Sequence, residues 1–125
     1  MKSEDLALKI LIAEDDESSY QLLSILVRKF GKEIIRVKTG TQALEVCLNQ
    51  PDIDLVLMDI QMPEMDGYKA TRKIREFNTK VIIIAQTAYA LDEDKVIALA
   101  AGCNDYISKP IKKDLLLGLI KKYFE

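Results

Sequence analysis

Five short apolar segments recur along the chain at intervals of about 20–27 residues, the length of one strand followed by one helix. Three of them are nearly continuous runs of Ile, Val, Leu and Met rather than alternating patterns. Such runs are typical of strands that are covered on both faces, as in a parallel sheet. The predicted strands are Lys9–Ala13, Ile34–Val37, Leu55–Met58, Val81–Ala85 and Asp105–Ile107.

Apolar residues at helical spacing follow each predicted strand. Pro51 closes the second helical pattern and Gly102 the fourth, as expected for helix C-termini. Because parallel strands need right-handed crossovers, the order predicts an α/β fold: a doubly wound five-stranded parallel sheet with helices on both faces. The helical positions are Leu22, Leu23, Leu26, Val27 and Phe30; Ala43, Leu44 and Leu48; Ala70, Ile74 and Phe77; Ile97, Ala100 and Ala101; and Leu115, Leu116, Leu119, Ile120 and Tyr123.

The length of 125 residues predicts one domain over residues 1–125, with residues 1–7 as a flexible N-terminal extension. No apolar run approaches the ~20 residues that a membrane span needs, and the polar, acidic start is no signal peptide. A net charge of −2 gives no reason to expect direct binding to nucleic acid.

The chain contains no histidine, which excludes Ser-His and Cys-His nucleophile pairs and histidine metal sites. Any phosphohistidine with which it reacts must therefore lie on another domain or chain. Its two cysteines, Cys47 and Cys103, form no CxxC pair, and we expect both to be small buried side chains in a reducing compartment.

Acidic side chains follow two of the predicted strands, and ligands of open parallel sheets bind at this carboxyl end. In the strand order 2-1-3-4-5, the first and third strands are neighbours, so Glu14, Asp15 and Asp59 should converge. Three close carboxylates repel unless one is protonated or a cation lies between them, and oxygen ligands alone suit Mg²⁺. The alternative, acids that complement a helix N-terminus, suits Asp16 and Glu17.

Two further polar residues follow the fourth and fifth strands, in Gln86-Thr87-Ala88 and Ser108-Lys109-Pro110. Taken alone, Thr87 could be an ordinary strand-end residue and Lys109 a solvated lysine. Together with the acids they form a set suited to phosphoryl chemistry. A carboxylate can attack phosphorus, while a cation and a hydroxyl stabilise the phosphoryl oxygens.

Four stretches, ILIAEDDES, DLVLMDIQMPEMDGYKATRKIR, IIIAQTAYA and AAGCNDYISKPI, resemble the receiver domain of two-component response regulators over essentially the full length. The resemblance implies the flavodoxin-like order 2-1-3-4-5, which is known for this family and is therefore not an independent prediction. The pattern Glu14-Asp15 together with the second and fourth stretches is most similar to receivers attached to hybrid histidine kinases.

By this resemblance Asp59 is the phosphoacceptor, and Glu14, Asp15, Asp59 and the backbone carbonyl of Gln61 hold Mg²⁺, with Mn²⁺ as an alternative. Many receivers have Asp at the position of Glu14, and the longer side chain is expected to reach the metal through water. Thr87 and Lys109 sense the phosphoryl group, and Tyr106 is the switch aromatic, with a half-buried strand tyrosine as its alternative interpretation. The Lys109–Pro110 bond is expected to be cis.

The implied function is Mg²⁺-dependent acceptance of a phosphoryl group from a phosphohistidine of a histidine kinase or histidine phosphotransfer domain. Such a domain catalyses its own phosphorylation but is no turnover enzyme by itself. We expect it in the cytoplasm, alone or as the cytoplasmic portion of a membrane-bound hybrid kinase, without direct membrane contact. A weak dimer through the fourth helix, fifth strand and fifth helix is a further expectation.

Three other functions fit these residues less well. A haloacid dehalogenase-type phosphohydrolase uses Asp-x-Asp, but the second position here is Gln61, which cannot serve as the general acid. An FMN-binding module needs a phosphate-cradling loop after the first strand, where this chain has Glu14 and Asp15. A phosphorylation-independent receiver-like module should have lost Asp59, Thr87 or Lys109, and all three are present.

Overall fold

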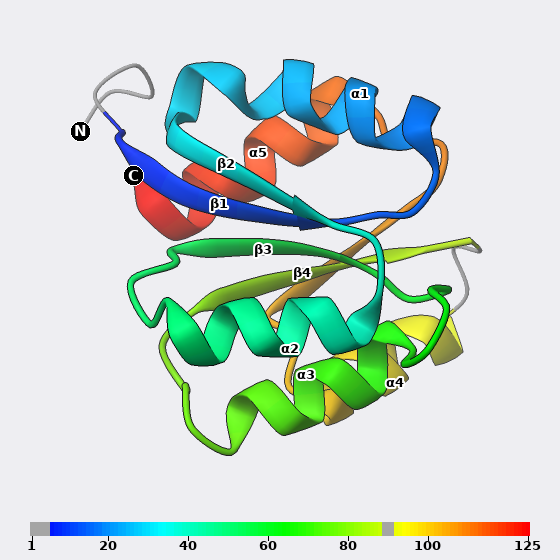
Figure 1. Ribbon diagram of the computed structural model, residues 1–125. Helices are drawn as coiled ribbons and strands as arrows, with labels where there is room; N and C mark the ends of the chain where they lie inside the picture. Colours follow the sequence, from blue (N-terminus) through cyan, green and yellow to red (C-terminus); the bar gives the residue numbers. More distant parts are fainter. Residues whose placement is uncertain (1–5, 89–91) are drawn as a thin grey trace.

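The computed structural model describes residues 6–88 and 92–125, which form one five-stranded parallel sheet with helices on both faces (Figure 1). The strand order is β2-β1-β3-β4-β5, so the predicted fold class is confirmed. The strands are β1 (Leu8–Ala13), β2 (Gly31–Val37), β3 (Leu55–Asp59), β4 (Ile82–Thr87) and β5 (Asp105–Ser108). The helices are α1 (Glu17–Val27), α2 (Gly40–Asn49), α3 (Gly67–Arg75), α4 (Asp92–Ala101), α5 (Lys113–Phe124) and the short 3₁₀ helix η2 (Arg28–Phe30).

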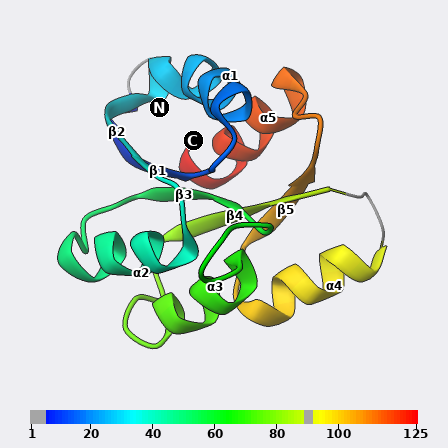
Figure 2. The ribbon, with the colours of Figure 1, turned by 45° about the vertical axis from the view of Figure 1, so that its right-hand side comes forward.

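Two helical layers cover the sheet, with α1 and α5 on one face and α2, α3 and α4 on the other (Figures 1 and 2). Successive strand residues alternate between the two cores: Leu57 and Ile84 face α1 and α5, whereas Met58 and Ala85 face α2 to α4. Strands β1 and β3 are buried along their whole length, as their continuous apolar sequences predict. Cys47 and Cys103 are both buried and free, which confirms that they are small core residues.

Side-chain caps start the helices that flank the acidic strand ends. The Asp16 carboxylate accepts a hydrogen bond from Ser19 N at the start of α1, and Asp66 accepts one from Lys69 N at the start of α3. Gly67 lets α3 approach the end of β3 closely, because a Cβ there would lie 2.4 Å from the Asp59 carbonyl oxygen. The first turn of α3 is therefore packed directly against Asp59.

Several element bounds differ from the predictions. Strand β2 begins at Gly31 rather than Ile34, and Phe30 belongs to η2 rather than to α1. Helix α3 ends at Arg75, so Phe77 lies beyond it and is partly exposed. Strand β4 starts one residue later than predicted and continues to Thr87.

The N-terminal prediction is tested only in part. Residues 1–5 of the expected extension 1–7 lie outside the described residues. Leu6 is buried against the α1/α5 core, so the packed chain already includes this residue. Within residues 6–88 and 92–125, no helix combines the length and apolar character needed to cross a membrane.

Candidate functional site

The carboxyl ends of β1 and β3 bring three acidic side chains together. One carboxylate oxygen each from Glu14, Asp15 and Asp59 lies within 4.8 Å of the others. Glu14 and Asp59 are buried, whereas Asp15 is exposed. The predicted convergence of these acids is confirmed, because β1 and β3 are hydrogen-bonded neighbours whose ends share one edge of the sheet.

Lys109 extends from the residue after β5 to this acidic cluster. Its Nζ lies 3.0 Å from Glu14 Oε1 and 3.3 Å from Asp59 Oδ2. The backbone N–H of Lys109 donates to the Thr87 carbonyl at 2.7 Å, which fixes the start of this segment against the end of β4. The Lys109–Pro110 bond is cis, as expected.

Burial makes the Glu14 carboxylate costly to ionise. Burial, followed by its hydrogen bond with Asp59, raises the pKa of Glu14 to about 7, although Lys109 opposes this shift. Its Oε2 accepts a hydrogen bond from Asp16 N. Glu14 Oε1 is fully buried and has no well-directed hydrogen bond from the described residues, since its 3.0 Å contact with Lys109 is an ion pair without that alignment.

Lys109 is held in its charged form by the acids. Burial alone would lower the pKa of the ammonium, but the contacts with Glu14 and Asp59 outweigh it and raise the pKa above its ordinary value. One lysine nevertheless faces three carboxylic groups. The all-oxygen donor set and the poorly satisfied Glu14 Oε1 therefore fit a divalent cation such as Mg²⁺.

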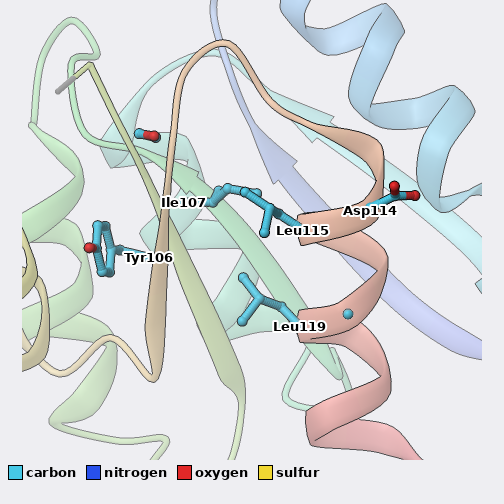
Figure 3. Close-up of a pocket in the computed structure, with 7 residues that line it drawn as sticks. Tyr106, Ile107, Asp114, Leu115 and Leu119 are labelled. Atoms are coloured by element: carbon cyan, nitrogen blue, oxygen red, sulfur yellow. The ribbon is translucent and has the colours of Figure 1, made fainter. Parts of the chain in front are cut away.

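The remaining predicted residues lie around this cluster. Gln61 follows β3, and its backbone N–H donates to Asp59 Oδ1 at 3.1 Å. Thr87 is buried at the end of β4, paired in register with Ser108 of β5. Tyr106 is partly buried and packs against the α2–α4 core. Figure 3 shows its ring on the opposite side of β5 from the α5 residue Leu119.

Two residues at the site were not predicted from the sequence to take part in it. Arg36 on β2 donates to the Glu14 carbonyl oxygen at 3.3 Å and pairs with Glu17, so it braces the β1–α1 connection. Gln86, the residue before Thr87, is buried with no hydrogen-bond partner among the described residues. A polar residue inside the apolar β4 run was the available signal for Gln86, whereas nothing local in the sequence links Arg36 to Glu14.

Comparison with known proteins gives one consistent result. Residues 10–121 match the family model of the response regulator receiver domain. The chain is 41% identical to hybrid signal transduction histidine kinase L of Dictyostelium discoideum over 92% of its length, and 38% identical to transcription factor SKN7 of Saccharomyces cerevisiae over 93%. It spans only 7% and 18% of the lengths of these two relatives.

Solved structures with the same fold include two informative receivers. One is in the co-crystal structure of the Saccharomyces cerevisiae histidine phosphotransfer protein Ypd1 with the receiver domain of Ssk1 (TM-score 0.86, 30% identity, covering 94% of this chain and 89% of that chain). Another is the receiver domain of sensor histidine kinase PA1611 from Pseudomonas aeruginosa, with magnesium in its active-site cleft (TM-score 0.83, 36% identity, covering 94% and 97%). On this similarity and the family match, the chain belongs to the response regulator receiver domain family.

Proposed function

We propose that Asp59 is the phosphoacceptor and that the chain receives its phosphoryl group from a phosphohistidine of a partner. One observation carries this proposal: Asp59 is buried at the end of β3, in contact with the Lys109 ammonium and within 4.8 Å of two further acids. This arrangement supports the proposal because a carboxylate nucleophile would have a cation and candidate metal ligands beside it.

Glu14, Asp15 and Asp59, together with the Gln61 backbone carbonyl, are the residues that would hold Mg²⁺, and Mn²⁺ suits the same oxygen ligands. When bound, the ion would neutralise charge on the transferring phosphoryl group. The PA1611 receiver, which binds magnesium in its active-site cleft, supports this assignment.

The side chains have complementary tasks in the transfer. An Asp59 carboxylate oxygen attacks phosphorus, and the bond from phosphorus to the donor's imidazole nitrogen breaks, with its electron pair remaining on that nitrogen. The Lys109 ammonium compensates the charge of Asp59 and then of the phosphoryl oxygens. The Thr87 hydroxyl donates to a phosphoryl oxygen, and Tyr106 changes position in response, which alters the α4–β5–α5 surface.

The donor is a histidine phosphotransfer domain or histidine kinase, because this chain has no histidine of its own. A hollow of about 200 Å³ beside the site has room for one side chain of this partner, and it is lined by Ser18, Ser19, Leu22, Lys109, Pro110 and Ile111. The Ssk1 receiver, which crystallised with the phosphotransfer protein Ypd1, supports this choice of partner.

The similarity to hybrid kinases favours a place in the cytoplasm as the receiver module of a longer signalling protein. Helices α4 and α5 flank the edge strand β5 on opposite faces of the sheet, and both carry exposed apolar side chains, including Val96 and Leu115. An apolar hollow of about 400 Å³ lies between β5 and α5 (Figure 3). These features support a weak dimer through α4, β5 and α5.

The test is intact mass spectrometry after incubation with a small acyl phosphate and Mg²⁺. We expect one added phosphoryl group in the wild type and none in Asp59→Asn or in the presence of a chelator. Asp54→Asn, a matched acid at the opposite end of β3, should be phosphorylated like the wild type. Modification that persists in Asp59→Asn would refute the assignment.

A further inference from the structure

The side chain of Gln86 is an anomaly in β4. It is only 1% exposed, and neither its Nε2 nor its Oε1 has a hydrogen-bond partner among the described residues. Buried carboxamides normally have partners, because an unpaired polar atom loses its bonds to water without replacement. An apolar side chain of similar size would pack in this strand without that penalty, so the core alone does not explain a glutamine here.

Strand geometry places Gln86 beside the phosphoacceptor. Ile84 in β4 and Leu57 in β3 both belong to the α1/α5 core. Because strand side chains alternate, the residues two positions further along, Gln86 and Asp59, face the same side. Asp59 and Gln86 are also partners in the β3–β4 register, so they are direct neighbours across the two strands.

The path of Lys109 passes over the same residue. Lys109 follows β5, yet its ammonium contacts Asp59 on β3 and Glu14 after β1. Strand β4 lies between β5 and β3, so the lysine side chain must cross it. Gln86 is the last β4 residue on the α1/α5 face, since β4 ends at Thr87 on the other face. The Gln86 side chain therefore points to the face of β4 that the lysine side chain crosses, and its register neighbour in β3 is Asp59.

We propose that Gln86 is a positioning residue for phosphoryl transfer. During the reaction its Nε2 donates to the Asp59 carboxylate and its Oε1 accepts from the Lys109 ammonium, which fixes the two groups relative to each other. The inference rests on the proposed function of Asp59. The Gln86 carboxamide would gain its hydrogen bonds in the reacting state. This would explain why a glutamine stands at a buried position where it has no hydrogen-bond partner among the described residues.

The test compares Gln86→Met with Ile84→Val, a conservative change on the same face of β4 but deeper in the core. For each variant we would measure the rate constant of phosphorylation by a small acyl phosphate at saturating Mg²⁺, and the melting temperature in metal-free buffer. We expect Gln86→Met to react about tenfold more slowly or worse, with a melting temperature equal to or above that of the wild type. Ile84→Val should melt earlier and react at the wild-type rate.

The Mg²⁺ concentration for half-maximal rate should stay within about twofold in Gln86→Met, because Gln86 orients the reacting groups and is no metal ligand. A Gln86→Met rate within about twofold of the wild type would overturn the inference. So would a melting temperature that falls together with the rate, since that is the result of a merely structural role. If the wild type itself accepts no phosphoryl group, the proposed function of Asp59 is refuted. If the wild type is phosphorylated but Gln86→Met reacts at the wild-type rate, only the inference on Gln86 is refuted.

Discussion

Strand β1 has a lysine paired with two acids near each of its ends, and the two clusters behave differently. Near the amino end, Lys9 Nζ lies 3.1 Å from Asp52 and 3.9 Å from Glu33, whose side chains are 67% and 53% exposed. Near the carboxyl end, Lys109 Nζ contacts Glu14 and Asp59, whose side chains are 0% and 4% exposed. The distances are similar, so burial of the acids is the main difference.

The pKa shifts of the acids follow that difference. At the amino end, the hydrogen bond from Lys9 lowers the pKa of Asp52, as in an ordinary ion pair. At the carboxyl end, burial raises the pKa of Glu14 to about 7 despite the lysine. Water solvates the excess negative charge of the exposed acids in the Lys9 cluster. The buried acids of the Lys109 cluster lack that solvation and need a further cation or a proton. The exposure of the acids thus distinguishes a solvated ion pair from a buried cluster that needs a further positive charge or a proton.

The largest difference between the two clusters should appear when each lysine is replaced by methionine. Lys109→Met leaves two buried carboxylic groups without their cation, so we expect the metal-free free energy of unfolding at pH 8 to fall by about 3 kcal/mol or more. Lys9→Met leaves acids that water already solvates, and we expect a loss of about 1 kcal/mol or less. Urea denaturation measures both losses, and equal values would contradict the comparison.

The pH dependence of stability tests the burial of Glu14 itself. Its folded pKa of about 7 exceeds the ordinary value of 4.5, so the folded chain binds more protons than the unfolded chain between these values. The metal-free free energy of unfolding should therefore fall as the pH rises through this window and become level above it, with a contribution from Glu14 of about 3 kcal/mol.

Glu14→Gln removes this contribution, so its free energy of unfolding relative to the wild type should increase from pH 4.5 to about 7. Glu33→Gln is the matched control, a glutamate beside the other lysine. Urea midpoints across the window measure both differences. If the difference in unfolding free energy between Glu14→Gln and the wild type does not change with pH, the raised pKa of Glu14 is contradicted. An equal pH dependence in Glu33→Gln would contradict it as well.

Magnesium should act on one cluster alone. At ten times its dissociation constant, a ligand that binds only the folded state stabilises it by about 1.4 kcal/mol. We expect this gain in the wild type and in Asp52→Asn, and its loss in Asp59→Asn, measured by thermal unfolding with NaCl added to match ionic strength. Equal stabilisation of Asp59→Asn would place the ion elsewhere.

The smallest effect should come from the exposed acid of the Lys9 cluster. Because salt screens exposed pairs, Asp52→Asn should shift the urea midpoint only slightly at low ionic strength and not at all in about 1 M NaCl. A shift that persists in high salt would mean that the Lys9 cluster is less solvated than its exposure indicates.

Local patterns were sufficient for the parallel sheet, whereas the convergence of the site also needed the strand order that the family resemblance implies. The continuous apolar runs of β1 and β3 predict buried parallel strands, and parallel strand ends share one edge of the sheet. Glu14 and Asp59 therefore meet as expected. The reach of Lys109 to both acids follows from the same geometry together with the family resemblance.

Features that depend on residues distant in sequence were not predictable. Helix α3 ends before Phe77 where Arg75 donates to the Gly102 carbonyl and to Asn104 Oδ1, 27 and 29 residues away. Lys9 is buried in β1 because Asp52, 43 residues later, supplies its charge partner. Neither partner is visible in the local pattern of α3 or β1.

The most direct test of the central claim is to locate the phosphoryl group chemically. Borohydride reduces an aspartyl phosphate to homoserine, so the phosphorylated chain would be reduced, digested and sequenced by mass spectrometry. We predict homoserine at position 59 and at no other acidic position, with none in a sample treated with chelator before phosphorylation. Homoserine at position 15, or a phosphorylated chain without any reducible residue, would contradict the account.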